Sequence, residues 1–270
     1  MRQRLLPAVA CLALLVPAAA DAVTADPPGI TGSGWAKGAA LAARPVPHPL
    51  EGRTVVLDPG HQLGNSRHLA QINHLVTAGP SRKACNTTGT STNGGYPEAT
   101  FTWRVAQVVR RSLQRAGARV VLTRSSNSRA AWGPCVDARG RAGARAHADL
   151  EVSIHADGSF ARGARGFHVI APASLRGWTD DIAAPSRRLA LTLRAALSRA
   201  HFTRANYIAG GDGLDVRSDL GTLNLSDVPV AMVELGNMRD ATEARRMTSA
   251  AGRKRYARAL VAGISHYLRR

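Results

Sequence analysis

Two histidines and two glutamates stand at places where α/β proteins often carry their chemistry. His61, His155 and Glu234 each come at the end of, or just after, a short run of apolar, mostly β-branched residues. Glu98 follows a proline and opens a pattern typical of a helix. Side chains near the carboxyl ends of parallel strands converge on one crevice of an open sheet. We therefore expect these four side chains to meet.

The residue types indicate the chemistry of the site that these four side chains would form. Two imidazoles and one carboxylate form the His₂Glu ligand set of a catalytic zinc site, which leaves a second carboxylate to act as a base. Zinc polarises a carbonyl and lowers the pKa of water from about 15.7 to about 7. The set predicts a hydrolase with Zn²⁺ as its cofactor. Asp58 is expected to be structural, because Asp58-Pro59-Gly60 is a turn signal.

The elements that must position these residues alternate between strands and helices. This order predicts a single α/β domain with a mixed, mostly parallel sheet and helices on both faces. Glu151 lies within a strand pattern and is interpreted as a solvated residue. The long polar segment 62–96 is expected to be a functional loop. The predicted strands are 53–58, 119–123, 150–154, 166–170 and 228–235, and the predicted helices are 97–116, 137–148, 181–200, 240–247 and 253–267.

The amino-terminal region predicts export. A basic start, an apolar stretch from Leu5 to Val16 and small residues near Ala22 are typical of a secretory signal peptide over 1–22. That stretch is too short for a stable membrane span, so no transmembrane span is expected in the mature chain. Residues 23–49 are rich in Pro, Gly and Ala and are interpreted as a linker, and residues 50–270 as the globular domain. The expected location is secreted, in the periplasm or at the cell wall.

The cysteines agree with export. Cys11 would leave with the signal peptide, so the mature chain would keep only Cys85 and Cys135. A single pair in an exported protein is most simply a disulfide. The alternative, a Cys/His metal site, lacks the CxxC spacing that such sites often show.

The charge of the chain points to anionic partners. The net charge is +18, from 36 basic and 18 acidic residues. An exported basic protein meets anionic wall polymers and carboxylate-bearing peptides. Nucleic acid is not expected as a partner, because aromatic residues make up only 4% of the chain, too few for stacking platforms. We expect a monomer.

In its motifs the chain resembles a known family, the zinc-dependent N-acetylmuramoyl-L-alanine amidases of the Amidase_3 group. Its variant motif endings resemble those of actinobacterial forms without a separate wall-binding domain. The resemblance implies zinc held by His61, Glu98 and His155, with Glu234 as the catalytic carboxylate. It also implies that residues 50–270 are the catalytic domain, and that peptidoglycan or muropeptides are the substrates. The segments that carry the resemblance are 56–61, Glu98, 149–157 and 228–236.

The chain departs from the family pattern in several places, and none of these departures removes a predicted ligand or the base. Asp157 stands where the family often has Asn, and Asn224 where it often has Arg. The departures therefore bear on substrate preference and rate more than on reaction type.

Two other functions remain open from the sequence. One is another zinc hydrolase of the wall, either a peptidase or a sugar deacetylase. The other is a non-catalytic basic wall-binding protein, in which Glu234 would be dispensable. A new L-alanine amino terminus among the products would indicate the amidase, whereas released acetate would indicate a deacetylase.

Overall fold

The structure is a computed structural model that describes residues 48–269. The predicted signal peptide at 1–22, and residues 23–47 of the predicted linker at 23–49, lie outside the described residues. Over the described part of the chain, every helix is too short or too polar to cross a membrane.

A six-stranded sheet in the order β4-β1-β5-β8-β6-β7 forms the centre of the fold. All neighbouring strands in it are parallel except β6 and β8, which pair antiparallel. This confirms the predicted mixed, mostly parallel sheet. The strands are β1 (Thr54–Pro59), β4 (Arg119–Leu122), β5 (Leu150–Asp157), β6 (His168–Pro172), β7 (Leu214–Arg217) and β8 (Val230–Asn237).

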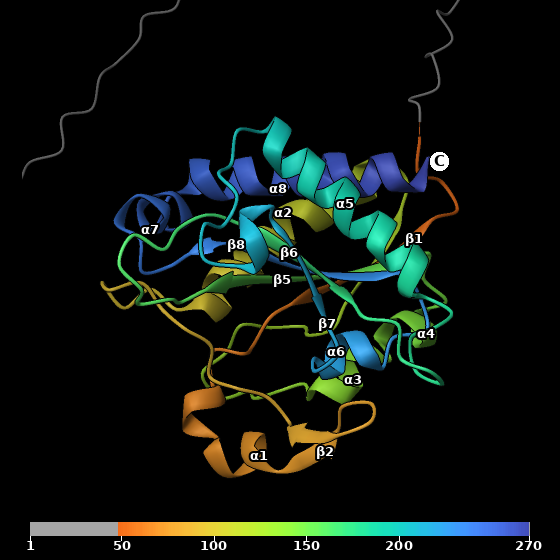
Figure 1. Cartoon of the computed structure of the whole chain (residues 1–270), viewed down its shortest axis with the longest axis horizontal. Helices are drawn as coiled ribbons and strands as arrows, with labels where there is room; N and C mark the ends of the chain where they lie inside the picture. The colour runs from red at the N-terminus through yellow and green to blue at the C-terminus, as the bar shows by residue number, and fades with distance from the viewer. Residues whose placement is uncertain (1–47, 270) are drawn as a thin grey trace, which may run out of the picture. The chain divides into compact units, whose positions relative to one another are not determined.

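Helices cover both faces of this sheet (Figure 1). On one face lie α2 (Glu98–Arg115), α5 (Ala183–Arg199) and α8 (Ala250–Leu268), with α8 packed against the other two. The other face carries α3 (Val136–Gly140), α4 (Ala142–Ala146) and α6 (Gly221–Asn224). The remaining helices are α1 (Leu69–Asn73), α7 (Ala241–Thr248), η1 (Asn65–Arg67) and η2 (Ala209–Gly211).

The central strands β1, β5, β8 and β6 are buried on both sides, which explains their continuous apolar runs. Val55 and Leu57 point into the main core with Phe101 and Val105 of α2, whereas Val56 packs with Ala146 on the opposite face. Full burial of an aliphatic side chain of this size stabilises a fold by about 1.5–3 kcal/mol. The alternation therefore fixes which face of β1 receives α2.

Four features differ from the sequence-based expectations. The segment 62–96 is not a plain loop, because it contains α1 and an antiparallel hairpin of β2 (Leu75–Thr77) and β3 (Arg82–Ala84). The predicted helix 137–148 is divided into α3 and α4, and β7 and α6 were not predicted. Glu151 is fully buried and not solvated, because β5 is a central strand with helices on both faces.

Candidate active site and metal centre

The carboxyl ends of three parallel strands bring the predicted residues together. His61 follows the end of β1, His155 lies in the last part of β5, and Glu234 lies on β8. His155 and Glu234 are direct partners across the β5–β8 ladder. The rings of His61 and His155 are 4.8 Å apart between centroids.

Glu98 completes this cluster from the start of α2. The helix begins at Glu98 because Pro97 takes the extended conformation of an N-cap. The Glu98 Oε2 atom lies 3.2 Å from Nε2 of His61, and its Oε1 atom lies 3.0 Å from Nδ1 of His155. One ligand atom from each of these three residues lies within 4.8 Å of the others. Two imidazole nitrogens and a carboxylate at this spacing fit a single zinc ion.

Backbone groups fix the carboxylate and one of the rings. The amides of Thr90 and Ala156 donate to the two Glu98 oxygens at 2.9 and 3.1 Å. Nδ1 of His61 donates to the Thr87 carbonyl at 3.1 Å, which leaves Nε2 to face Glu98. Such outer contacts set the tautomer of a metal-binding histidine. Burial alone raises the pKa of Glu98, but the charge of His61 and hydrogen bonds from both histidines hold it below its usual range.

Two glycines are required by the close approach of the backbone to the cluster. A Cβ atom at Gly60 would lie 2.2 Å from the His155 ring. A Cβ atom at Gly89 would lie 2.8 Å from His61 and 2.9 Å from Glu98, and its φ of +74° also favours glycine. His61 itself has a φ of 58°, which is uncommon for a non-glycine residue. The site is therefore built with local backbone strain that the surrounding contacts must hold.

A buried ion pair supports the turn that carries His61. Asp58 and Arg139 form this pair, with side chains 0% and 3% exposed. Arg139 also donates to the carbonyl of His61 at 2.9 Å, and Ser153 Oγ donates to Asp58 at 2.7 Å. Burial by itself raises the pKa of Asp58, but Arg139 and hydrogen bonds from Thr123 and Ser153 hold it below its usual value. Asp58 lies outside the ligand cluster, which agrees with its predicted structural role.

Glu234 is placed to act in the same pocket without belonging to the ligand cluster. Its Oε2 atom is buried and has no hydrogen-bond partner among residues 48–269. Burial, together with the charges of Glu98 and Asp157, raises the pKa of Glu234 well above its usual value. An unpartnered carboxylate oxygen is available to accept or deliver a proton.

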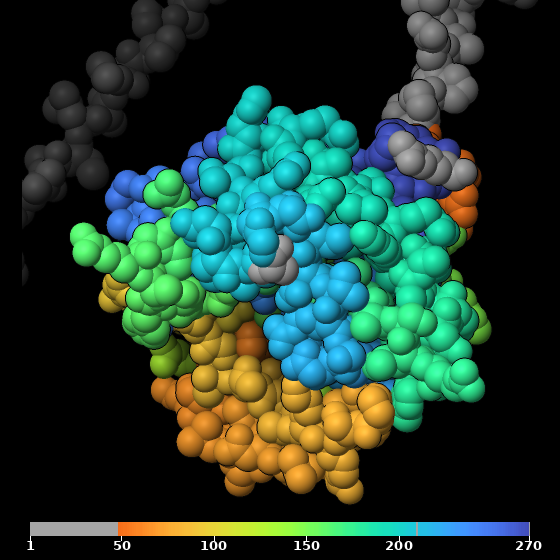
Figure 2. Space-filling model, in the orientation of Figure 1, coloured from red at the N-terminus to blue at the C-terminus, as the bar shows by residue number. Residues whose placement is uncertain are grey.

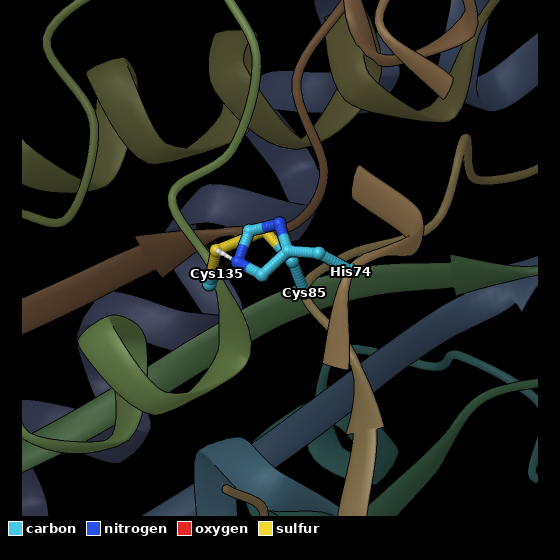
Figure 3. A group of neighbouring side chains, drawn as sticks. All are labelled: His74, Cys85 and Cys135. Carbon is cyan, nitrogen blue, oxygen red and sulfur yellow. Dashed lines mark hydrogen bonds between the residues drawn. A yellow bond between two sulfur atoms is a disulfide. The ribbon is translucent and has the colours of Figure 1, made fainter. Parts of the chain in front are cut away.

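The predicted disulfide between Cys85 and Cys135 is present and joins positions that are 50 apart in the sequence. It ties the end of the β2–β3 hairpin to the start of α3 (Figure 3). His74 lies beside it, with Nε2 3.8 Å from Sγ of Cys135. Because thiolates bind metals and disulfide sulfurs are not thiolates, this second His/Cys group is not a ligand set. The disulfide lies two residues from Thr87, which holds the ring of His61.

The pocket above the cluster has a volume of about 340 Å³. It includes His61, His155 and Glu234, and its rim includes Lys83 and Asp219. Figure 2 shows the surface hollowed between the yellow and orange segment that contains the hairpin and the blue segment that contains α6. A larger groove of about 670 Å³ is lined by residues such as Arg53 and Asp149, which precede β1 and β5. That groove lies at the opposite ends of the strands and contains none of the cluster residues.

The structure thus brings all four predicted residues into one site. Sequence reasoning missed the residues that support them, namely Thr87, Gly89 and Arg139. The length and turn content of segment 62–96 signalled a functional region that includes Thr87 and Gly89. No pattern in the sequence distinguished Arg139 from the other arginines of the chain.

Comparisons with known proteins show the family to which the chain belongs. The sequence profile of the N-acetylmuramoyl-L-alanine amidases, Amidase_3, matches residues 55–266. An N-acetylmuramoyl-L-alanine amidase of Mycobacterium tuberculosis is 40% identical over 84% of this chain and 91% of its own length. The crystal structure of the N-acetylmuramyl-L-alanine amidase of Mycobacterium abscessus is 43% identical and has a TM-score of 0.74, covering 81% of this chain and 99% of that one.

The corresponding enzyme of Mycobacterium smegmatis is 37% identical with a TM-score of 0.75, over 81% and 98% of the two chains. The profile matches most of the chain, and the alignments span nearly the full lengths of these relatives. The chain therefore belongs to the Amidase_3 family of N-acetylmuramoyl-L-alanine amidases, as its motifs predict.

Proposed function

We propose that this amidase hydrolyses the amide between N-acetylmuramic acid and L-alanine at the pocket formed by β1, β5 and β8, with zinc held by His61, Glu98 and His155. The observation that carries this assignment is the convergence of the three ligand atoms within 4.8 Å beside the free oxygen of Glu234. The family membership supplies the reaction, and the donor set supplies the reason for choosing zinc.

The residues of the chain divide the work in this proposal. Bound zinc would supply a Lewis acid for the amide carbonyl and make water a better nucleophile near neutral pH. Glu98 is held as an anion by two backbone amides and two imidazoles. Glu234 would accept a proton from the attacking water and deliver it to the leaving L-alanine nitrogen, because its Oε2 atom has no competing partner.

The setting of this reaction is part of the same proposal. We propose that the chain is exported through the signal peptide at 1–22 and acts as a monomer on peptidoglycan or on its released fragments, in wall turnover. The disulfide supports an oxidising compartment. The net charge of +18 supports attraction to anionic wall polymers.

Digestion of muropeptides by the purified mature chain tests the reaction. Mass spectrometry should find products with a new L-alanine amino terminus, and a strong chelator should abolish their formation. Release of acetate in place of that amino terminus would identify a sugar deacetylase and overturn the assignment.

Variants of the site test the roles of its residues. His61→Ala should lower both the zinc content and the turnover, since it removes a ligand. Glu234→Gln should keep the zinc and lose turnover by about 10²-fold or more. His266→Ala is the matched control, because this histidine lines the larger groove away from the site. Normal turnover in the Glu234 variant would disprove its role as the base.

A further inference from the structure

Two basic side chains converge on one carboxylate at the mouth of the active-site pocket. Arg217, at the end of β7, donates from Nε and Nη2 to the two oxygens of Asp219, both at 2.8 Å. Lys83, on β3, lies 3.2 Å from Oδ2 of the same aspartate. Asp219 and Lys83 line the pocket that contains His61, His155 and Glu234. The mouth of the pocket therefore holds a carboxylate bound by an arginine fork and a lysine.

We propose that Arg217 and Lys83 form a subsite for a carboxylate of the stem peptide, and that Asp219 occupies this subsite in the free enzyme. The inference rests on the proposed function, because it assigns the pocket to a muramoyl peptide. A planar guanidinium fork matches a carboxylate through two parallel hydrogen bonds, and Asp219 shows this geometry here. Lys83 adds a second positive charge from a separate element.

The two elements that carry the subsite are fastened to each other. Asn224 is fully buried, and its Nδ2 atom donates to the carbonyls of Ala78 and Ser218, both at 2.9 Å. Ala78 belongs to the turn of the β2–β3 hairpin, and Ser218 lies between Arg217 and Asp219. Nζ of Lys83 also donates to the backbone carbonyl of Asp219 at 2.6 Å. These contacts position the cations before any ligand arrives, which lowers the cost of ordering them on binding.

The exposure of the group suits exchange of one carboxylate for another. The side chains of Lys83, Arg217 and Asp219 are 42%, 40% and 51% exposed. Exposed ion pairs contribute about 1 kcal/mol or less, so a substrate carboxylate can compete with Asp219 for the same donors. Lys83 and Asp219 line the same pocket as Glu234. An anion bound at this subsite would therefore lie in the same pocket as the catalytic residues.

The test compares two muramoyl dipeptides. One carries a free carboxylate on the residue after L-alanine, and in the other this group is a carboxamide. The measured quantity is the ratio of kcat/KM for the acid to that for the amide. Dissociation constants for both compounds are also measured by calorimetry in the Glu234→Gln background, where turnover is slow.

Arg217→Gln and Lys83→Gln should each lower the acid-to-amide ratio by about fivefold, the factor that corresponds to about 1 kcal/mol. Asp219→Asn should raise the ratio, because it removes the competing charge. Arg194→Gln is the matched control. Arg194 pairs with Asp212 outside the subsite, so this substitution removes the same charge elsewhere on the protein. A structural role alone would change both substrates equally.

Each outcome bears on one part of the assignment. Equal ratios in the wild type, Arg217→Gln and Lys83→Gln would overturn the subsite. An unchanged or lower ratio in Asp219→Asn would overturn its role as the internal occupant. Failure of the wild type to cleave either dipeptide would count against the proposed function instead, and the dissociation constants would still decide the subsite.

Discussion

Replacement of Arg139 by methionine tests how the active-site turn is held in place. Arg139 is 3% exposed and is paired with Asp58, which is fully buried. Its guanidinium also donates to the carbonyls of His61 and Pro134, each at 2.9 Å. Methionine fills part of the volume but leaves the Asp58 charge without its cation and the His61 carbonyl without the Arg139 donor. Breaking a buried pair from one side costs about 3–5 kcal/mol.

That loss is a large part of the 5–15 kcal/mol by which domains are usually stable. Chemical denaturation followed by circular dichroism should therefore show a midpoint far below that of the wild type. The zinc content should also fall, because the His61 carbonyl loses its anchor. Adding Asp58→Asn to the variant should restore part of the stability, since it removes the unpaired charge.

An exposed pair provides the control for this experiment. Arg194→Met breaks the pair with Asp212, whose side chain is 54% exposed, and should cost less than about 1 kcal/mol. A free energy of unfolding of Arg139→Met within 1 kcal/mol of the wild type would refute the reasoning about the buried pair. The same conclusion would follow if adding Asp58→Asn to Arg139→Met lowered the stability by as much as Asp58→Asn lowers that of the wild type.

Three more predictions concern other parts of the molecule. Burial raises the pKa of Glu151 well above its usual value, so the folded state keeps a proton that the unfolded chain releases as pH rises. Glu151→Gln should thus gain thermal stability over the wild type as pH rises from about 4.5 to 7.5, and an equal gap at both ends would contradict this. Replacing both Cys85 and Cys135 by alanine should cost about 4 kcal/mol, because the disulfide closes a loop of 50 residues, and denaturation measures the loss. Wall pelleting of the Glu234→Gln protein should weaken as salt rises past about 0.15 M, where the screening length is about 8 Å; binding that is insensitive to salt would exclude retention by charge.

Glu151 and segment 62–96 show where sequence reasoning reached its limit. An acidic residue in a strand pattern usually faces solvent, but Glu151 lies on a strand that pairs with β1 on one side and β8 on the other. Its burial follows from the strand order and from the helices on both faces, which a local pattern does not contain. The hairpin of segment 62–96 was missed because its strands have only three residues each and lack an alternating pattern.

The sequence by itself determined the site residues that the strand ends carry. Apolar runs must be buried, and parallel strands place their carboxyl ends at one edge, so His61, His155 and Glu234 had to converge once the fold class was known. Only the tertiary structure decided that Arg139 supports the His61 turn and that Arg217 and Lys83 share one carboxylate. The contacts Arg139–His61, Arg217–Asp219 and Lys83–Asp219 join residues that are 78, 2 and 136 positions apart in the sequence. They depend on side-chain directions that are set by the packing of helices and loops. No local periodicity of the sequence records that packing.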